Sequence, residues 1–134
     1  EYLEYRSSKQ ISFTFESPEG KLYSDLNEEL YGWVIENLIK NAIDAMLGKG
    51  ELSVHINSDS KKIKINILDT GKGINKSLFK KIFKPGYTSK KRGWGLGLSV
   101  SKRIIEDYHN GKIFVKKSEV QKGTNIEILL DKIS

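Results

Sequence analysis

Alternating apolar and polar positions predict five strands along this chain. The first spans residues 10–16, where isoleucine and two phenylalanines alternate with polar side chains. Two more, at 51–57 and 61–68, flank a polar turn, and the second sets three isoleucines against lysine and asparagine. The last two, at 112–118 and 124–130, flank a short turn that contains glycine. Both of these pairs are expected to form hairpins.

A different spacing, with apolar residues three and four apart, predicts the helices. Apolar residues at this spacing fill the segment 30–46, and the helix is expected to start near Ser24 and Asp25. A short helix is predicted at residues 76–83. A second long helix is predicted at 96–109, where an asparagine–glycine pair closes it.

The order of these elements is strand, helix, two strands, helix, helix, two strands. Short turns between neighbouring strands favour antiparallel pairing. The predicted fold is therefore α/β (α+β), a two-layer sandwich of a mixed, mostly antiparallel sheet with helices on one face. Residues 10–134 are expected to form one domain, and residues 1–9 the end of an upstream helix or linker. The glycine-rich segment 93–99 lacks the lysine–serine pair of a P-loop.

Composition excludes several classes of site. The chain has no cysteine, which removes disulfides, thiolate metal sites and a thiol nucleophile. Its two histidines, His55 and His109, are 54 residues apart, so a histidine-based metal site is not expected. No apolar run reaches the roughly 18 residues of a membrane span, and no signal peptide opens the chain. The chain begins at Glu1, without methionine, and is expected to be part of a longer protein.

The positive charge is concentrated in one part of the chain. Between Asp69 and Glu106 lie 36 residues without a carboxylate, and ten of them are lysine or arginine. This stretch therefore carries +10, against a whole-chain charge of +6. A cationic segment with glycine hinges is suited to covering a polyphosphate, because glycine lets backbone N–H groups approach an anion. A pI near 9.4 alone would also fit a nucleic-acid-binding protein.

Two asparagines interrupt the apolar pattern of the first long helix. Asn37 and Asn41 are four residues apart and therefore share one face, with Asp44 beside them. Amide oxygens are hard, neutral ligands that suit a water-rich magnesium ion. The alternative is that both are buried structural amides or exposed polar residues, and an isolated asparagine pair favours that alternative.

Three glycine motifs complete the candidate chemistry. Asp69 follows an apolar strand, where a carboxylate can accept a hydrogen bond from an exocyclic amine, and two glycines after it let a flat ring lie against the backbone. The motif Gly93-Trp94-Gly95-Leu96-Gly97 precedes a helix whose N-terminal amides can hold phosphate oxygens. The third motif is Gly123-Thr124 in the last hairpin. Each motif alone is also common in ordinary turns.

In this order and spacing, the motifs resemble the ATP-binding catalytic domain of sensor histidine kinases. That family belongs to the GHKL superfamily, which has the Bergerat fold and includes type II topoisomerases, ninety-kilodalton heat-shock chaperones and MutL mismatch-repair ATPases. The resemblance covers about residues 10–130. Five ordered boxes carry it: an N box at 36–45, a G1 box at 69–74, an F box at 79–90, a G2 box at 93–98 and a last box at 123–124.

The resemblance implies a role for each box. Asp69 would bond the adenine amine, with support from Thr124 directly or through water. Asn41, with Asn37, would hold Mg²⁺ against the phosphates, and residues 84–96 would form a mobile lid. The residues that the resemblance assigns to binding ATP are Asn37, Asn41, Asp69, Gly71, Gly73, Ile74, Tyr87, Lys90, Lys91, Arg92, Gly93, Gly95, Leu96, Gly97, Leu98 and Thr124.

The residue at position 37 bears on mechanism. Hydrolysing branches of the superfamily carry, four residues before the magnesium asparagine, a glutamate that activates water, whereas the amide of Asn37 cannot accept a proton at neutral pH. Glu36 is rotated by about 100° around the helix and should point elsewhere. Transfer of the phosphoryl group to a protein side chain is therefore favoured over hydrolysis. Lys40 is a candidate for neutralising phosphate charge, and Asp44 stands where many histidine kinases carry a basic residue.

The implied activity is that of a protein histidine kinase, with ATP and Mg²⁺ as cofactors. The acceptor would be a histidine on an upstream dimerisation domain, and a response-regulator aspartate would receive the phosphoryl group next. The fragment alone is expected to be a cytoplasmic monomer without membrane or nucleic-acid contact, from a parent that can be an inner-membrane sensor. Two alternatives stay open: an anti-sigma-type serine kinase of the same superfamily, and a nucleic-acid-binding module that uses the basic stretch.

Overall fold

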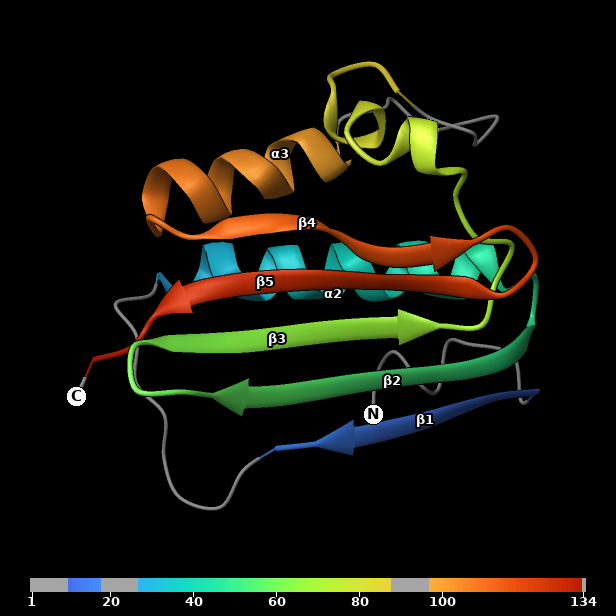
Figure 1. Ribbon diagram of the computed structural model, residues 1–134, viewed down its shortest axis with the longest axis horizontal. Helices are drawn as coiled ribbons and strands as arrows, with labels where there is room; N and C mark the ends of the chain where they lie inside the picture. The colour runs from blue at the N-terminus through green and yellow to red at the C-terminus, as the bar shows by residue number, and fades with distance from the viewer. Residues whose placement is uncertain (1–9, 18–26, 88–96, 134) are drawn as a thin grey trace.

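Five strands form one mixed sheet in the order β1-β2-β3-β5-β4 (Figure 1). The computed structural model describes residues 10–17, 27–87 and 97–133. β1 is parallel to β2, and the other three pairs are antiparallel, so the predicted mostly antiparallel sheet is confirmed. The strands are β1 (Gln10–Glu16), β2 (Lys49–Ser58), β3 (Lys62–Asp69), β4 (Lys112–Glu119) and β5 (Gly123–Asp131).

The long helix α2 (Glu28–Ala45) crosses one face of the sheet, and the sheet lies in front of it in Figure 1. Its N-cap is Asn27, whose side chain accepts a hydrogen bond of 3.1 Å from the amide of Leu30. Glu28 and Glu29 lie in its first turn, where the helix dipole favours negative charge. The predicted start at Ser24 and Asp25 lies outside the described residues, and the helix begins only after Asn27.

The core lies between α2 and the central strands. On α2, Val34, Leu38 and Ala42 are buried at intervals of four residues, which places them on one helix face. On β3, Ile63 and Ile65 are buried at alternate positions and belong to the same cluster. The apolar face of α2 and the apolar face of β3 therefore pack against each other in one core.

The remaining helical segments are more irregular than the sequence predicts. The second long helix consists of α3 (Gly97–Arg103) followed by a π-helical turn (Ile104–Tyr108). The predicted helix at residues 76–83 is instead two 3-10 turns, η1 (Lys76–Leu78) and η2 (Lys81–Phe83). The amide after each turn bonds to a carbonyl three residues back, which is the pattern that limits such turns to a few residues.

His109 joins the far ends of the two long helices. Its Nε2 accepts a hydrogen bond of 2.9 Å from the amide of Asn27. Because a neutral imidazole has one donor and one acceptor, its Nδ1 carries the proton and donates to the carbonyl of Ile104 at 2.8 Å. The second contact caps the end of this helix, and the first ties that end to the start of α2.

Candidate functional site

Asp69 ends β3 with its side chain on the face of the sheet that α2 covers. Ile67, two residues earlier, belongs to the buried core, and alternate residues of a strand share a face. The carboxylate of Asp69 accepts a hydrogen bond of 2.8 Å from the amide of Gly71. Burial raises the pKa of Asp69, and the backbone N–H groups of Gly71 and Thr124 partly offset that rise. This carboxylate retains lone pairs with which it can accept a further donor.

The loop after β3 is held between α2 and the β4–β5 hairpin. On one side, the amide of Lys72 donates to the carbonyl of Ala45 at 3.0 Å. On the other side, the amide of Gln121 donates to the carbonyl of Lys72 at 2.8 Å. Gly73 has a φ of +74°, and a Cβ there would lie 2.0 Å from the carbonyl oxygen of Glu119. Only glycine fits this position, so the path of the loop depends on it.

Asn37, Asn41 and Ala45 form a stripe along α2, spaced by one turn each and spanning about 12 Å. A Cβ on Gly97, at the start of α3, would lie 2.8 Å from Oδ1 of Asn37. A Cβ on Gly71, in the loop after β3, would lie 2.6 Å from the carbonyl oxygen of Ala45. Asn41 therefore occupies the middle of a helix side whose two ends meet α3 and the β3 loop.

The start of α3 is fixed to α2 through Asn37. The side-chain amide of Asn37 donates to Oγ of Ser101 at 3.2 Å, and Ser101 donates to the carbonyl of Gly97 at 2.7 Å. Ser101 has an exposed fraction of 0%, so its hydroxyl cannot exchange these partners for water. Sequence reasoning did not single out Ser101. The available signal was its position one helical turn after the glycine motif.

Lys40 and Glu36 pair with each other on α2. Their side chains form an ion pair of 3.0 Å, and each is about half exposed. Ion pairs this exposed contribute little to stability. The charge of Lys40 is engaged by Glu36, so the predicted role of Lys40 beside phosphate requires this pair to open. Asp44, one turn later, is also exposed.

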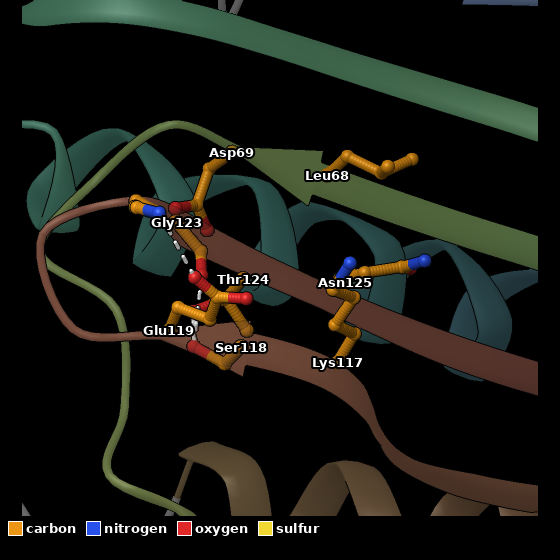
Figure 2. Close-up of a pocket in the computed structure, with 9 residues that line it drawn as sticks. Leu68, Asp69, Lys117, Ser118, Glu119, Gly123, Thr124 and Asn125 are labelled. Atoms are coloured by element: carbon orange, nitrogen blue, oxygen red, sulfur yellow. Dashed lines mark hydrogen bonds and ion pairs between the residues drawn. The ribbon is translucent and has the colours of Figure 1, made fainter.

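Two hydroxyls lie beside Asp69 in the sheet. Thr124 is the ladder partner of Asp69 on β5, and Ser118 is the ladder partner of Thr124 on β4. Their hydroxyl oxygens are 2.8 Å apart, and Figure 2 shows the contact. Thr124 was predicted as a site residue, whereas Ser118 was not. The structure thus brings one unexpected side chain to this end of the site.

A cavity of about 420 Å³ lies at this end of the sheet, against β3, β4 and β5 (Figure 2). Its lining includes Leu68 and Asn125, which strand alternation places on the face away from α2, and also Lys117. Asp69 and Thr124 border it because they belong to the strands that separate the two faces. The residues that line this cavity come from β3, β4, β5 and the β4–β5 turn.

Of the predicted lid, residues 84–96, the structure describes only residues 84–87. Phe83, just before the lid in sequence, is buried. Nζ of Lys102 lies 5.6 Å from the centre of its ring. Phe79, Tyr87 and Leu98 are partly buried and pack against the core. The predicted site residues that lie outside the described residues are Lys90, Lys91, Arg92, Gly93, Gly95 and Leu96.

Amide oxygen is the ligand type that this site offers to a metal. Within residues 10–17, 27–87 and 97–133, no three His, Cys, Asp or Glu side chains gather to hold a metal ion. Asn41 lies between α3 and the β3 loop, and Mg²⁺ is commonly held by few protein ligands together with waters and substrate phosphates. The donor set therefore fits magnesium that arrives with a phosphorylated ligand.

Comparison with known proteins matches residues 27–133 to the family described as histidine kinase-, DNA gyrase B-, and HSP90-like ATPase. Sporulation kinase D of Bacillus subtilis is 41% identical over 97 residues, which cover 72% of this chain and 19% of that kinase. Sensor protein kinase WalK of Staphylococcus epidermidis is 33% identical over 132 residues, covering 92% of this chain and 21% of that protein. The chain spans about a fifth of the length of these two relatives.

Solved structures share the fold. The catalytic domain of histidine kinase ThkA, in a nucleotide-free form, matches with a TM-score of 0.82 and 31% identity, covering 92% of this chain and 81% of that one. A ThkA structure in complex with response regulator protein TrrA matches with a TM-score of 0.78 and 29% identity, covering 92% of this chain and 34% of that one. Mycobacterial sensor histidine kinase MprB, at 23% identity and a TM-score of 0.85, covers 98% of this chain and 87% of its own and supports the fold.

Proposed function

Because the chain belongs to the histidine kinase-, DNA gyrase B- and HSP90-like ATPase family, we propose that it is the ATP-binding catalytic domain of a sensor histidine kinase. It would transfer the γ-phosphoryl group of Mg-ATP to a histidine on a dimerisation domain, from which a response-regulator aspartate receives it. One observation carries the proposal. The asparagine stripe of α2 runs from the start of α3 to the loop that follows Asp69.

At one end of the stripe, Asp69 would recognise the base. Backbone N–H groups orient its carboxylate, and the remaining lone pairs can accept from the 6-amino group of adenine. Partial burial strengthens such a bond, because the local dielectric is lower than that of water. Protonation removes acceptor capacity, so adenine affinity should fall in acid as the pH passes the raised pKa of Asp69.

From the middle of the stripe, Asn41 would contribute an oxygen to the magnesium ion, and the start of α3, at the other end of the stripe, would face the phosphates. Gly97 and Leu98 open α3, where backbone N–H groups have no partner within the helix. The basic segment 84–96, as a cover over the phosphates, is part of the same proposal. Bound magnesium would neutralise phosphate charge, and Asn41 would orient it.

Two contacts support transfer over hydrolysis. The side chain of Asn37 is an amide engaged with Ser101, and an amide is not a base for water. The neighbouring carboxylate, Glu36, is paired with Lys40. Catalysis would then depend mainly on positioning and charge neutralisation, as in other phosphoryl transfers. The nucleophile would be the imidazole of the acceptor domain.

The proposed partner is suggested by a structural neighbour. ThkA, one structural neighbour, has been solved in complex with a response regulator protein, and we extend that type of partner to this chain as a proposal. The cytoplasm is the proposed compartment. None of the helices in the described residues combines the length and the apolar character needed to cross a membrane.

Titration with a fluorescent adenine nucleotide, with and without Mg²⁺, tests the proposal. Asp69→Asn is expected to weaken binding in both conditions by about tenfold to a hundredfold, because a hydrogen bond to a charged group contributes about 1.5–3 kcal/mol. Asn41→Ala is expected to remove mainly the part of the affinity that depends on Mg²⁺. Normal binding by Asp69→Asn would refute the role of this carboxylate.

Asp59→Asn is the matched control for Asp69→Asn. The carboxylate of Asp59 also accepts backbone hydrogen bonds, from Lys61 and Lys62, but it lies in the exposed β2–β3 turn. This control should bind nucleotide as the wild type does. DNA binding that weakens steeply with salt, without any nucleotide affinity, would instead support a nucleic-acid-binding function.

A further inference from the structure

A bulge in β4 turns Ser118 toward the base-recognition end of the site. Val115 belongs to the buried core, and the pairing register shifts between Val115 and Lys117. Without the extra residue, strict alternation would place Ser118 on the opposite face, because a shift of one residue reverses the faces of a strand. With it, Ser118 pairs with Thr124, which pairs with Asp69, in one row across three strands. Bulges are often found where a side chain is re-aimed beside a site.

The hydroxyl of Ser118 has three neighbours (Figure 2 shows two of these contacts). The amide of Ile74 donates to it at 2.7 Å, and it donates to the carbonyl of Gly123 at 2.8 Å. The hydroxyl oxygen of Thr124 lies 2.8 Å away. A hydroxyl has one proton and two lone pairs. Ser118 donates its hydroxyl hydrogen to the carbonyl of Gly123, and one of its lone pairs accepts from the amide of Ile74. Only its second lone pair is left to interact with Thr124.

Thr124 must therefore donate its own proton to Ser118. The oxygen of Thr124 then presents lone pairs alone to the site, as the ionised carboxylate of Asp69 does. Two acceptors side by side favour a base edge that carries donors, such as the 6-amino group of adenine. They disfavour the 6-oxo group of hypoxanthine or guanine, which is itself an acceptor.

We propose that Ser118 is a positioning residue: it fixes the direction in which the hydroxyl of Thr124 donates its hydrogen bond. The site thereby selects 6-amino over 6-oxo purines. The inference rests on the proposed nucleotide-binding function and deepens it. Ser118 also accepts a hydrogen bond from the amide of Ile74, in the loop predicted to line the base. The same hydroxyl therefore sets both the position of this loop and the direction of the hydrogen bond from Thr124.

The test compares the affinities of the 134-residue chain for ADP and for inosine diphosphate, which differ in the 6-substituent. Wild type is expected to prefer ADP. Ser118→Ala frees the proton of Thr124, which can then donate to a 6-oxo group. The ratio of ADP affinity to inosine diphosphate affinity is expected to fall about threefold to tenfold. This is the change in affinity that corresponds to one neutral hydrogen bond of about 0.5–1.5 kcal/mol. Ser118→Thr keeps the hydroxyl and should restore the preference.

Three further variants make the outcome specific. Ser53→Ala, in β2, changes another partly buried strand serine and should leave the ADP preference intact. If Ser118→Ala does not fold, Ser118→Cys carries the same expectation, because a thiol is a weak donor and acceptor. In a Thr124→Val background, Ser118→Ala should cause no additional loss of preference, since the residue it acts through is already changed.

Equal weakening of both nucleotides by Ser118→Ala would overturn the inference, since it would indicate a purely structural role. An additive effect in the Thr124→Val background would overturn it as well. Wild type that binds neither nucleotide would refute the proposed function, and the inference with it. Wild type that binds ADP, with an unchanged ADP preference in every Ser118 variant, would refute the inference alone.

Discussion

The two ends of the proposed site are held in different ways. The base end is part of the sheet, where Asp69, Thr124 and Ser118 lie in one row of a hydrogen-bonded ladder. The magnesium end is made by two helices, and Asn37 and Ser101 join them near the site through side-chain hydrogen bonds. A strand ladder has many backbone hydrogen bonds, so the loss of one leaves the others in place. A side-chain hydrogen bond, in contrast, can be removed by a single substitution. The proposed base end is thus held by a strand ladder, and the proposed magnesium end by single side-chain hydrogen bonds.

Gly73→Ala is expected to have the largest effect, because it disturbs the backbone at the base end. Its φ of +74° strains any other residue, and the new Cβ would meet the carbonyl oxygen of Glu119. We expect a loss of more than about 2 kcal/mol in the free energy of unfolding. Nucleotide affinity should fall with and without Mg²⁺. Denaturant unfolding and nucleotide titration measure the two effects, and wild-type values in both would show that the loop tolerates displacement.

Ser101→Ala should produce the next largest effect, at the opposite end. It removes the buried hydroxyl that accepts from the half-buried amide of Asn37, and an unsatisfied polar group of this kind costs about 1–3 kcal/mol at most. The start of α3 should then shift relative to α2, so the Mg²⁺-dependent part of the affinity weakens more than the Mg²⁺-independent part. Equal losses in the two conditions would contradict the division of the site into two separately held ends.

Asp69→Asn separates stability from recognition at the base end. The pKa of Asp69 is raised above 3.8 in the folded protein, so the folded state binds this proton more tightly than the unfolded chain. Stability contributed by Asp69 therefore falls as the pH rises from 3.8 through the raised value, and the ionised carboxylate is destabilising at neutral pH.

Asparagine can still accept the bond from Gly71 without carrying charge. The variant is expected to melt at the same temperature as wild type, or higher, at neutral pH, and to lose this part of the pH dependence while it loses nucleotide affinity. Thermal melting across acidic and neutral pH measures the difference. A lower melting temperature at neutral pH would indicate that the charge of Asp69 is favourable in the free protein.

Hydrophobic patterning predicted the sheet well. The five strand ranges differ from the observed ones by no more than two residues at either end, because each strand buries one face and the period of two is clear. The helical segments were harder to predict. The split of 76–83 into two turns and the π-helical turn after Arg103 depend on local hydrogen bonds that apolar spacing does not report.

The candidate site was predicted where glycine, aspartate and asparagine occur in ordered motifs, and the roles of its residues remain predictions. In the structure, Gly71 and Gly97 both lie close to α2. Ser118 and Ser101 could not be found in this way. Ser118 reaches the site through a bulge that reverses strand alternation, and Ser101 acts across a helix pair, so both depend on tertiary structure.

Gly32→Ala should have the smallest effect and serves as the reference for the variants at the two ends of the site. Gly32 lies on an exposed part of α2, and a Cβ there would meet nothing within 4 Å. Alanine should stabilise the helix by about 0.5–1 kcal/mol, because glycine loses more backbone freedom on folding. Melting temperature should rise while nucleotide affinity stays constant with and without Mg²⁺. A change confined to the Mg²⁺-dependent affinity would mean that the stiffness of α2 itself, and not only its contact with Ser101, sets the geometry of the magnesium end.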